Sequence, residues 1–180
     1  MLILKQILIF TKQVLFPFSF ILILAYPARG QQVTFNHVSQ PESSISGIIN
    51  GITQDSLGYM WFAVYNRLYR SDGYQLVVYQ NDPKDSTSLA SNAIETVYAD
   101  HNGIIWIGTQ QSGLDRFDPC TGIFTHFRSK TNDNASLSDD RVTAVLEDHE
   151  GTLWVGTVNG LNRMDQKTGT FTRFMHNTND

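Results

Sequence analysis

Apolar and polar residues alternate in short runs along the second part of the chain, and turn-forming residues separate these runs. The last group consists of the runs at residues 142–148, 152–157, 161–165 and 170–174. Gly151, Asn159-Gly160 and Gly169 lie between the runs, where tight turns favour these residue types. Alternation with a period of two is typical of strands. The pattern therefore predicts four short antiparallel strands.

This four-strand group occurs three times. EDHEGTLWVGTVNGLNRMD at residues 147–165 resembles ADHNGIIWIGTQQSGLDRFD at residues 99–118 and QDSLGYMWFAVYNRLYRSD at residues 54–72. The copies are spaced by 45 and 48 residues when they are anchored on Trp61, Trp106 and Trp154. A repeat of this length indicates a solenoid, a propeller or an array. In each copy a glycine lies three residues after an aspartate and three before the tryptophan, at Gly58, Gly103 and Gly151.

A four-stranded unit of this length cannot bury both of its faces alone, and radial stacking in a β-propeller hides them. We therefore predict an all-β chain with three four-stranded antiparallel propeller blades. The predicted repeats are residues 43–87, 88–135 and 136–180, after a lead-in strand or linker at residues 31–42. The repeated tryptophans and glycines are expected to form the structural core of the repeat. Because propellers typically close with about four to eight blades, three blades are expected to form an incomplete propeller.

Residues 1–30 have the pattern of a signal peptide. Lys5 and Lys12 precede an apolar run that extends from Val14 to Tyr26, and Ala28-Arg29-Gly30 suits cleavage. The run has 13 residues and contains Pro17, whereas a membrane-spanning helix needs about 18 or more. We therefore predict an exported protein with a cleaved signal, and an uncleaved signal anchor is the alternative.

Charge and cysteine content narrow the class of protein. The net charge is −4, and it becomes −7 once a signal that carries three of the 13 basic residues is removed. A negative chain is a poor partner for nucleic acid, whose phosphates attract lysine and arginine. Cys120 is the single cysteine, so the chain has no intramolecular disulfide. Stability must therefore come from packing.

The last repeat resembles the two-component regulator propeller repeat. The motifs that carry the resemblance are Ser136-Leu137, a strand that ends in Glu147-Asp148, the run GTLWVGT, the run GLNRMD, and Thr168-Gly169-Thr170-Phe171. The resemblance covers about residues 43–174. It is weakest in the first copy, where FAVYNR at residues 62–67 replaces the Ile-Gly-Thr stretch.

This resemblance implies a role in signal transduction. Members of the family carry paired propellers on the periplasmic side, followed by an immunoglobulin-like segment, one membrane helix and a cytoplasmic histidine kinase. Some are hybrid regulators with a DNA-binding output, and typical members from gut Bacteroidetes sense oligosaccharides released from complex glycans. The chain is then expected to be the N-terminal periplasmic part of an inner-membrane receptor. Its expected partners are the remaining blades, the kinase region and a second copy in a homodimer.

Candidate ligand-binding residues lie where the three copies differ, because loops on one rim of a propeller are free to vary. The loop between the second and third strands differs most. It carries Tyr65, Asn66 and Arg67 in the first copy, Gln110 and Gln111 in the second, and Asn159 in the third. The connections between the repeats are expected on the same rim. Amide, hydroxyl and aromatic groups there suit a sugar ligand.

The repeated aspartates and histidines have simpler structural interpretations. Asp55, Asp100 and Asp148 each open a tight turn, where an aspartate usually accepts hydrogen bonds from its own backbone. No carboxylates cluster as a calcium site would require. His101 and His149 follow two of these aspartates in solvated turns, and no nucleophile recurs nearby. We therefore expect no catalytic residues, metal or cofactor.

A second recurring set pairs arginines with aspartates two positions later. Its members are Arg70 with Asp72, Arg116 with Asp118, and Arg163 with Asp165. This recurrence predicts ion pairs or hydrogen bonds between blades rather than a clamp for a substrate.

Two other classes of function stay open. One is a propeller that acts only as an interaction scaffold, although no Trp-Asp signature closes a repeat. The other is an enzyme such as a glycosidase, because sialidase Asp-boxes also place glycine and tryptophan after aspartate. Here the spacing from Asp148 to Gly151 is one residue longer, and no arginine triad can be assembled. Since a fold does not define a function, the sensor interpretation depends on the family resemblance.

Overall fold

The structure, a computed structural model, describes residues 45–176, which all fall in one structural unit of the chain. The predicted signal peptide and the lead-in segment lie outside the described residues. All twelve elements assigned in this part of the chain are strands. The first sheet contains β1 (Ile49–Gln54), β2 (Met60–Val64), β3 (Arg67–Ser71) and β4 (Leu76–Tyr79). The second contains β5 (Ile94–Ala99), β6 (Ile105–Thr109), β7 (Leu114–Asp118) and β8 (Ile123–Phe127). The third contains β9 (Val142–Glu147), β10 (Leu153–Thr157), β11 (Gly160–Asp165) and β12 (Thr170–Phe174).

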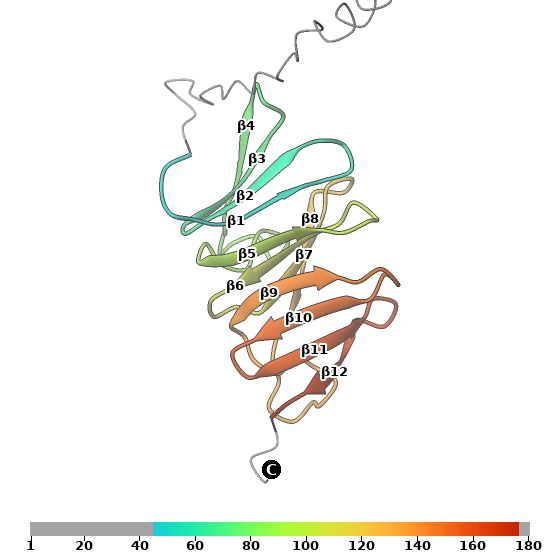
Figure 1. Cartoon of the computed structure of the whole chain (residues 1–180). Helices are drawn as coiled ribbons and strands as arrows, with labels where there is room; N and C mark the ends of the chain where they lie inside the picture. Colours follow the sequence, from blue (N-terminus) through green and yellow to red (C-terminus); the bar gives the residue numbers. More distant parts are fainter. Residues whose placement is uncertain (1–44, 177–180) are drawn as a thin grey trace, which may run out of the picture. The chain divides into compact units, whose positions relative to one another are not determined.

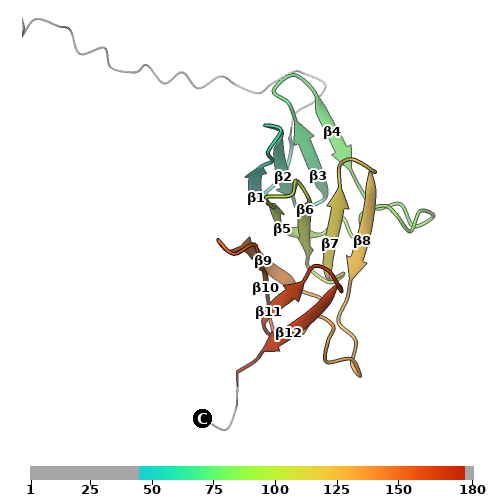
Figure 2. The ribbon, with the colours of Figure 1, turned by 90° about the vertical axis from the view of Figure 1, so that its right-hand side faces the viewer.

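Each sheet is an antiparallel meander in which the strands pair in chain order. The three sheets follow one another in the order of the sequence (Figure 1), and Figure 2 shows the same succession from the side. The first strands of the sheets are neighbours, because β1 contacts β5 and β5 contacts β9. This arrangement confirms the predicted all-β class and the four-stranded blades. We call the three sheets blades 1, 2 and 3.

The interface between blades 1 and 2 is a continuous apolar core. Trp61 and Leu68 of blade 1 are buried against Ile105, Ile107 and Phe117 of blade 2. The Trp61 and Phe117 ring centroids are 5.7 Å apart, in an edge-to-face arrangement that aromatic pairs favour. Burial of side chains this large is the main favourable contribution to the joint.

The interface between blades 2 and 3 repeats the same construction one blade further along. Trp106 and Leu114 are buried against Leu153, Val155 and Phe171 of blade 3. The side of each blade that carries its tryptophan therefore packs on the opposite side of the following blade. We call these two sides the Trp face and the rear face.

The fourth strands supply one aromatic residue to each side. In β8, Phe124 joins the core with blade 1, whereas Phe127 packs on the core with blade 3. The two residues are three positions apart, so strand alternation directs them to opposite faces. The connections between blades add Leu89 and Leu137, both fully buried, to the same two cores.

The turn between the first two strands explains the fixed spacing of aspartate, glycine and tryptophan. In blade 2, Asp100 Oδ1 accepts hydrogen bonds from the backbone N–H groups of Asn102 and Ile104, both at 2.9 Å. Asp100 Oδ2 accepts a hydrogen bond from Trp106 Nε1 at 2.8 Å. Gly103 has a φ of +80°, which other residues adopt only with strain. One carboxylate thus forms the turn and satisfies the buried indole.

Asp55 and Asp148 make the same contacts in blades 1 and 3, with Trp61 and Trp154 as the indole donors at 2.8 and 2.7 Å. The hydrogen bond from Trp154 is the main reason that the pKa of Asp148 is lowered from 3.8. The sequence correctly placed these aspartates in turns, but it gave no indication of the bond to the indole.

Arg70 and Arg116 do not form the expected ion pairs between blades, so that part of the prediction was wrong, whereas Arg163 lies on a face that no described blade covers. Among residues 45–176, no salt bridge includes Arg70, Arg116 or Arg163. Each arginine is instead the cross-strand partner of its blade's tryptophan. The guanidinium of Arg70 lies 4.7 Å from the centre of the Tyr59 ring, within the range of a cation–π contact.

The aspartates of this set have a different role, which is local. Asp72, Asp118 and Asp165 accept hydrogen bonds from backbone N–H groups of the turns that follow them. These bonds are the main reason that the pKa values of Asp72 and Asp165 are lowered from 3.8.

The described residues include no helix long and apolar enough to cross a membrane.

Candidate functional site

The candidate ligand residues lie in the loops between the second and third strands, and these loops adjoin the connections between blades. The backbone N–H of Gln110 donates to the Ala93 carbonyl at 2.9 Å, and that of Gly113 donates to the Asp140 carbonyl at 2.8 Å. The β6–β7 loop therefore touches the connection that enters blade 2 and the connection that leaves it. This placement puts the variable loops and the connections on one rim, which we call the loop rim.

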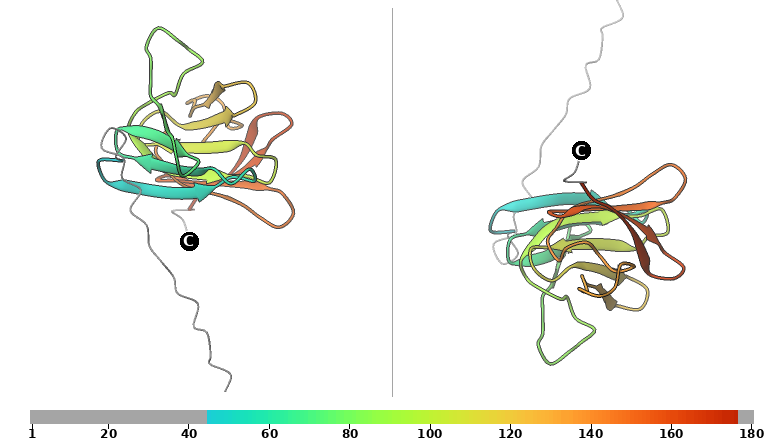
Figure 3. Two further views of the ribbon diagram at one scale, coloured as in Figure 1. Left: turned by 90° about the horizontal axis from the view of Figure 1, so that it is seen from above. Right: turned by 90° about the horizontal axis from the view of Figure 1, so that it is seen from below.

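Most of the six candidate side chains are accessible to solvent. Tyr65, Asn66, Arg67, Gln111 and Asn159 are exposed, and Gln110 is half-buried. Within residues 45–176, no hydrogen bond connects the candidates of one blade to those of another. The structure thus places them on a shared rim but on three separate blades. The connection between β4 and β5 extends outward from the blades as a loop (Figure 3).

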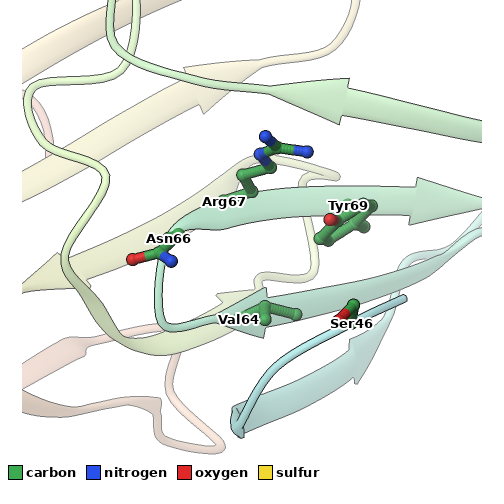
Figure 4. Close-up of a pocket in the computed structure, with 5 residues that line it drawn as sticks. All are labelled: Ser46, Val64, Asn66, Arg67 and Tyr69. Carbon is green, nitrogen blue, oxygen red and sulfur yellow. The ribbon is translucent and has the colours of Figure 1, made fainter. Parts of the chain in front are cut away.

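Blade 1 has a hollow at this rim. It has a volume of about 260 Å³ and is lined by Ser46, Val64, Asn66, Arg67 and Tyr69. Figure 4 shows these side chains around the β2–β3 hairpin and the segment that carries Ser46. Two of the six candidates therefore line a cavity, and hydroxyl, amide and guanidinium groups stand beside the apolar Val64 there.

Blades 2 and 3 use the position of Tyr69 differently. The equivalent residues are Asp115 and Asn162, both fully buried. Asp115 Oδ2 accepts a hydrogen bond from the Ala90 backbone N–H at 2.7 Å, and Asn162 Oδ1 accepts one from the Ser138 backbone N–H at 3.0 Å. Each side chain thus fastens the connection that enters its blade. Sequence reasoning missed this role, although the variable residue within the recurring Leu-x-Arg motif was visible.

A basic residue on the fourth strand strengthens each of these anchors. In blade 3, Arg173 Nε donates to the Ser136 carbonyl and Arg173 Nη2 to the Leu137 carbonyl, both at 2.8 Å. In blade 2, His126 Nδ1 lies 2.7 Å from Asp115 Oδ1, and His126 Nε2 lies 3.0 Å from the Ser86 carbonyl oxygen. Both ring nitrogens of His126 face acceptors, so the geometry favours the doubly protonated imidazolium.

The stability of the protein should therefore depend on the protonation of His126. The hydrogen bond to Asp115 raises the pKa of His126 above its ordinary value of 6.5. Because the folded state binds this proton more tightly, the stabilisation is complete below about pH 6.5 and is lost as the pH rises through the raised pKa. We expect the melting temperature to fall over that range. Scanning calorimetry across a pH series measures this dependence.

The matched variants for this measurement are His126→Gln and Asp115→Asn, the second of which copies the residue of blade 3. Both should flatten the dependence on pH above about pH 6.5, since neither retains the pair of charges. If the melting temperature of both variants falls with pH as steeply as that of the wild type, another titratable group causes the dependence.

The opposite rim consists of the turns between the first and second strands. There Glu147 Oε2 accepts a hydrogen bond from the His101 backbone N–H at 2.9 Å, and Glu147 Oε1 lies 2.5 Å from His101 Nδ1. Glu147 belongs to β9 of blade 3 and His101 follows β5 of blade 2, so the pair joins two blades.

Among residues 45–176, no group of three or more His, Cys, Asp or Glu side chains could hold a metal ion.

Comparison with known proteins finds matching repeats and a matching fold. The two component regulator propeller family matches residues 88–111 and 136–159. None of the curated proteins is significantly similar to the chain. The extracellular domain of the hybrid two component system BT3049 from B. thetaiotaomicron matches with a TM-score of 0.70 and 30% identity. That match covers 76% of this chain but 20% of the other, so the chain spans about a fifth of the relative.

A second group of solved structures is more distant. Virginiamycin B lyase from Staphylococcus aureus matches with a TM-score of 0.54 and 20% identity, over 71% of this chain and 41% of that chain. A streptogramin B lyase matches with the same score and identity, over 77% and 43%. Likeness at this level shows the propeller fold alone. The chain therefore contains two-component regulator propeller repeats, and its blades match part of the extracellular domain of a hybrid two-component system.

Proposed function

We propose that the chain is the N-terminal periplasmic segment of the sensory propeller of a two-component receptor, a hybrid histidine kinase. The observation that carries this proposal is the likeness to the BT3049 extracellular domain at 30% identity, together with the matching repeats. In this role the three blades are part of a larger propeller region. The kinase region of the receptor would carry out the phosphorelay, and the segment itself would bind rather than catalyse.

The ligand that suits the loop rim best is an oligosaccharide released from a complex glycan. Ligand recognition needs differences between blades, and the loop rim is where the three copies differ. The hollow of blade 1 combines the hydroxyls of Ser46 and Tyr69, the amide of Asn66 and the guanidinium of Arg67. Such groups hydrogen-bond to sugar hydroxyls. No cofactor or metal is part of this proposal.

The alternatives have weaker support. The lyase matches at 20% identity support a common fold and nothing about chemistry. A propeller that acts only as an interaction scaffold is consistent with the blades, but it does not explain the match to a sensor ectodomain. The proposed homodimer of the whole receptor follows from the family resemblance.

The proposal predicts that an Arg67→Ala substitution weakens oligosaccharide binding. Loss of one hydrogen bond from a charged donor costs about 1.5–3 kcal/mol, so the dissociation constant should rise about tenfold or more. Isothermal titration of the full chain with a panel of glycan-derived oligosaccharides measures this change. The matched control is Asn102→Ala in a turn of the opposite rim, which should leave affinity unchanged.

Two results would contradict this proposal. Equal losses of affinity in the two variants would show that the loop rim is not part of the binding site. Failure of every oligosaccharide in the panel to bind would contradict the ligand class.

A further inference from the structure

The first strand of each blade contains a β-bulge at the same place. In β5, the residues before and after Glu95 pair with consecutive residues of β6, so Glu95 is an extra residue without a cross-strand partner. The same irregularity makes Asn50 the extra residue of β1 and Thr143 that of β9. Bulges bend a strand and re-aim a side chain, and they are frequent beside functional sites. We call Asn50, Glu95 and Thr143 the bulge residues.

The bulges of blades 2 and 3 place their extra residues outside the joints between blades. Ile94 and Val97 are three positions apart, yet both lie in the core with blade 1, although plain alternation would direct them to opposite faces. Val142 and Val145 share the core between blades 2 and 3 in the same way. None of the bulge residues belongs to either core, since two of them are exposed and the third is half-buried. Packing between blades therefore does not determine which side chains these are.

The bulge residues lie at the inner edge of the loop rim. The first strands of adjacent blades contact each other, whereas the fourth strands lie further apart, and propeller blades surround a central channel. Two positions before each bulge residue, a backbone carbonyl accepts a hydrogen bond from the loop between the second and third strands of the same blade. These carbonyls belong to Ile48, Ala93 and Arg141, at N–O distances of 3.1, 2.9 and 3.2 Å. The bulge residues are therefore neighbours of the candidate ligand loops.

Glu95 has one carboxylate oxygen without a hydrogen-bond donor. Its Oε1 accepts a hydrogen bond from Arg141 Nη2 of blade 3 at 3.1 Å. Its Oε2 is buried and has no partner, and it is the only such buried side-chain atom among residues 45–176. A buried acceptor without a donor is destabilising, the more so when it is charged. This oxygen therefore indicates a donor that the described residues do not supply.

Asn50, Thr143 and Arg141 add complementary groups beside Glu95. Asn50 Nδ2 donates to the Ile94 carbonyl of blade 2 at 2.8 Å, so its amide oxygen is the acceptor that remains for a ligand. Thr143 Oγ1 donates to a backbone carbonyl of its own blade at 3.3 Å and keeps its acceptor lone pairs. Arg141 is 51% exposed and has further N–H donors. The charges of Arg141 and Glu95 offset each other, so the set suits a neutral ligand with many hydroxyl groups.

We propose that the bulge residues and Arg141 bind a neutral sugar unit at the inner edge of the loop rim. This inference rests on the proposed function, because it takes an oligosaccharide as the ligand, and it adds a second contact site and the charge class of the sugar. A sugar hydroxyl supplies the donor that Glu95 Oε2 lacks. The Glu95 side chain is 23% exposed, so a turn of its carboxyl group toward the rim brings this oxygen to the ligand. A sulfated or uronic acid unit is disfavoured, because its negative charge would face the carboxylate.

The test is isothermal titration of the full chain with two panels of oligosaccharides. The neutral panel consists of manno-, xylo- and galacto-oligosaccharides, and the acidic panel consists of oligogalacturonides of matched length. We expect the tightest binding from a member of the neutral panel. Glu95→Gln should raise the dissociation constant of that ligand about tenfold or more, since a hydrogen bond to a charged acceptor is lost. Thr143→Val leaves the pair of Glu95 and Arg141 intact and should raise it about two- to tenfold.

Glu147→Gln is the matched control. Glu147 also joins blades 2 and 3 through its carboxylate, but it lies on the opposite rim, so this variant should bind as the wild type does. Unchanged affinity in Glu95→Gln, or tighter binding of the acidic panel, would overturn this inference and leave an oligosaccharide as the ligand. Equal losses in Glu95→Gln and Glu147→Gln would also overturn it, since that result indicates a general loosening of the blades. Failure of the wild type to bind either panel would instead contradict the ligand class of the proposed function, and this inference with it.

Discussion

Replacing Trp106 with alanine should lower the free energy of unfolding by about 3–5 kcal/mol, the range for a large aromatic side chain removed from a core. The Trp106 side chain is buried between blades 2 and 3, and its Nε1–H donates to the buried Asp100 carboxylate. The substitution therefore removes apolar contacts, leaves a cavity and deprives Asp100 Oδ2 of its donor. Urea unfolding followed by circular dichroism measures the loss.

Trp154→Ala is the control for this prediction. Trp154 has the same place in the repeat and the same bond to an aspartate, but its side chain is only half-buried. Its removal should cost only about 1–2 kcal/mol. Equal losses for the two tryptophans would contradict the conclusion that a following blade covers the Trp face of blade 2.

A second large effect is expected for Gly113→Ala in the β6–β7 loop. Gly113 has a φ of +77°, and a Cβ atom there would lie 2.1 Å from the Phe127 carbonyl oxygen. The clash is with backbone, which cannot move without disturbing β8 and the connection to blade 3. The left-handed conformation and the overlap together should cost about 3 kcal/mol or more.

Gly122→Ala separates the two causes of that loss. Gly122 has a φ of +73°, yet a Cβ atom there would meet no atom within 4 Å. Its substitution should therefore cost only the conformational part, about 1–2 kcal/mol. Thermal unfolding of both variants gives the comparison. If Gly113→Ala lowers the stability no more than Gly122→Ala does, the backbone of the loop rim moves to avoid the clash, contrary to this prediction.

The blades could be predicted from the sequence because each repeat contains its own turn signals. Gly58, Gly103 and Gly151 all have positive φ, and the strands lie where the alternation placed them. These features depend on local chemistry, which a single repeat displays in full. The turn role of the aspartates could be predicted for the same reason.

Contacts between segments that are far apart in the chain were not accessible in this way. The anchor formed by Asp115 and His126 includes Ser86 and Ala90, which precede it by 25 to 40 residues. No periodic pattern marks such a pair, and Asp115 is a polar residue at a buried position. The arginines were misjudged because their cross-strand neighbour is the tryptophan, while the aspartates nearby in sequence bind their own turns.

The candidate site falls between these two cases. Its loops could be located by the differences between the copies, since strands constrain sequence more than loops do. The hollow of blade 1 could not be predicted, because it requires Tyr69 in place of the acid or amide that fastens the connection in the other blades.

The most direct test of the sensor assignment is to read the coding sequence beyond codon 180 in the source genome. We expect further repeats with the Trp-x-Gly-Thr motif, followed by a membrane helix and a histidine kinase region. A downstream sequence without such repeats and without a kinase would contradict the assignment.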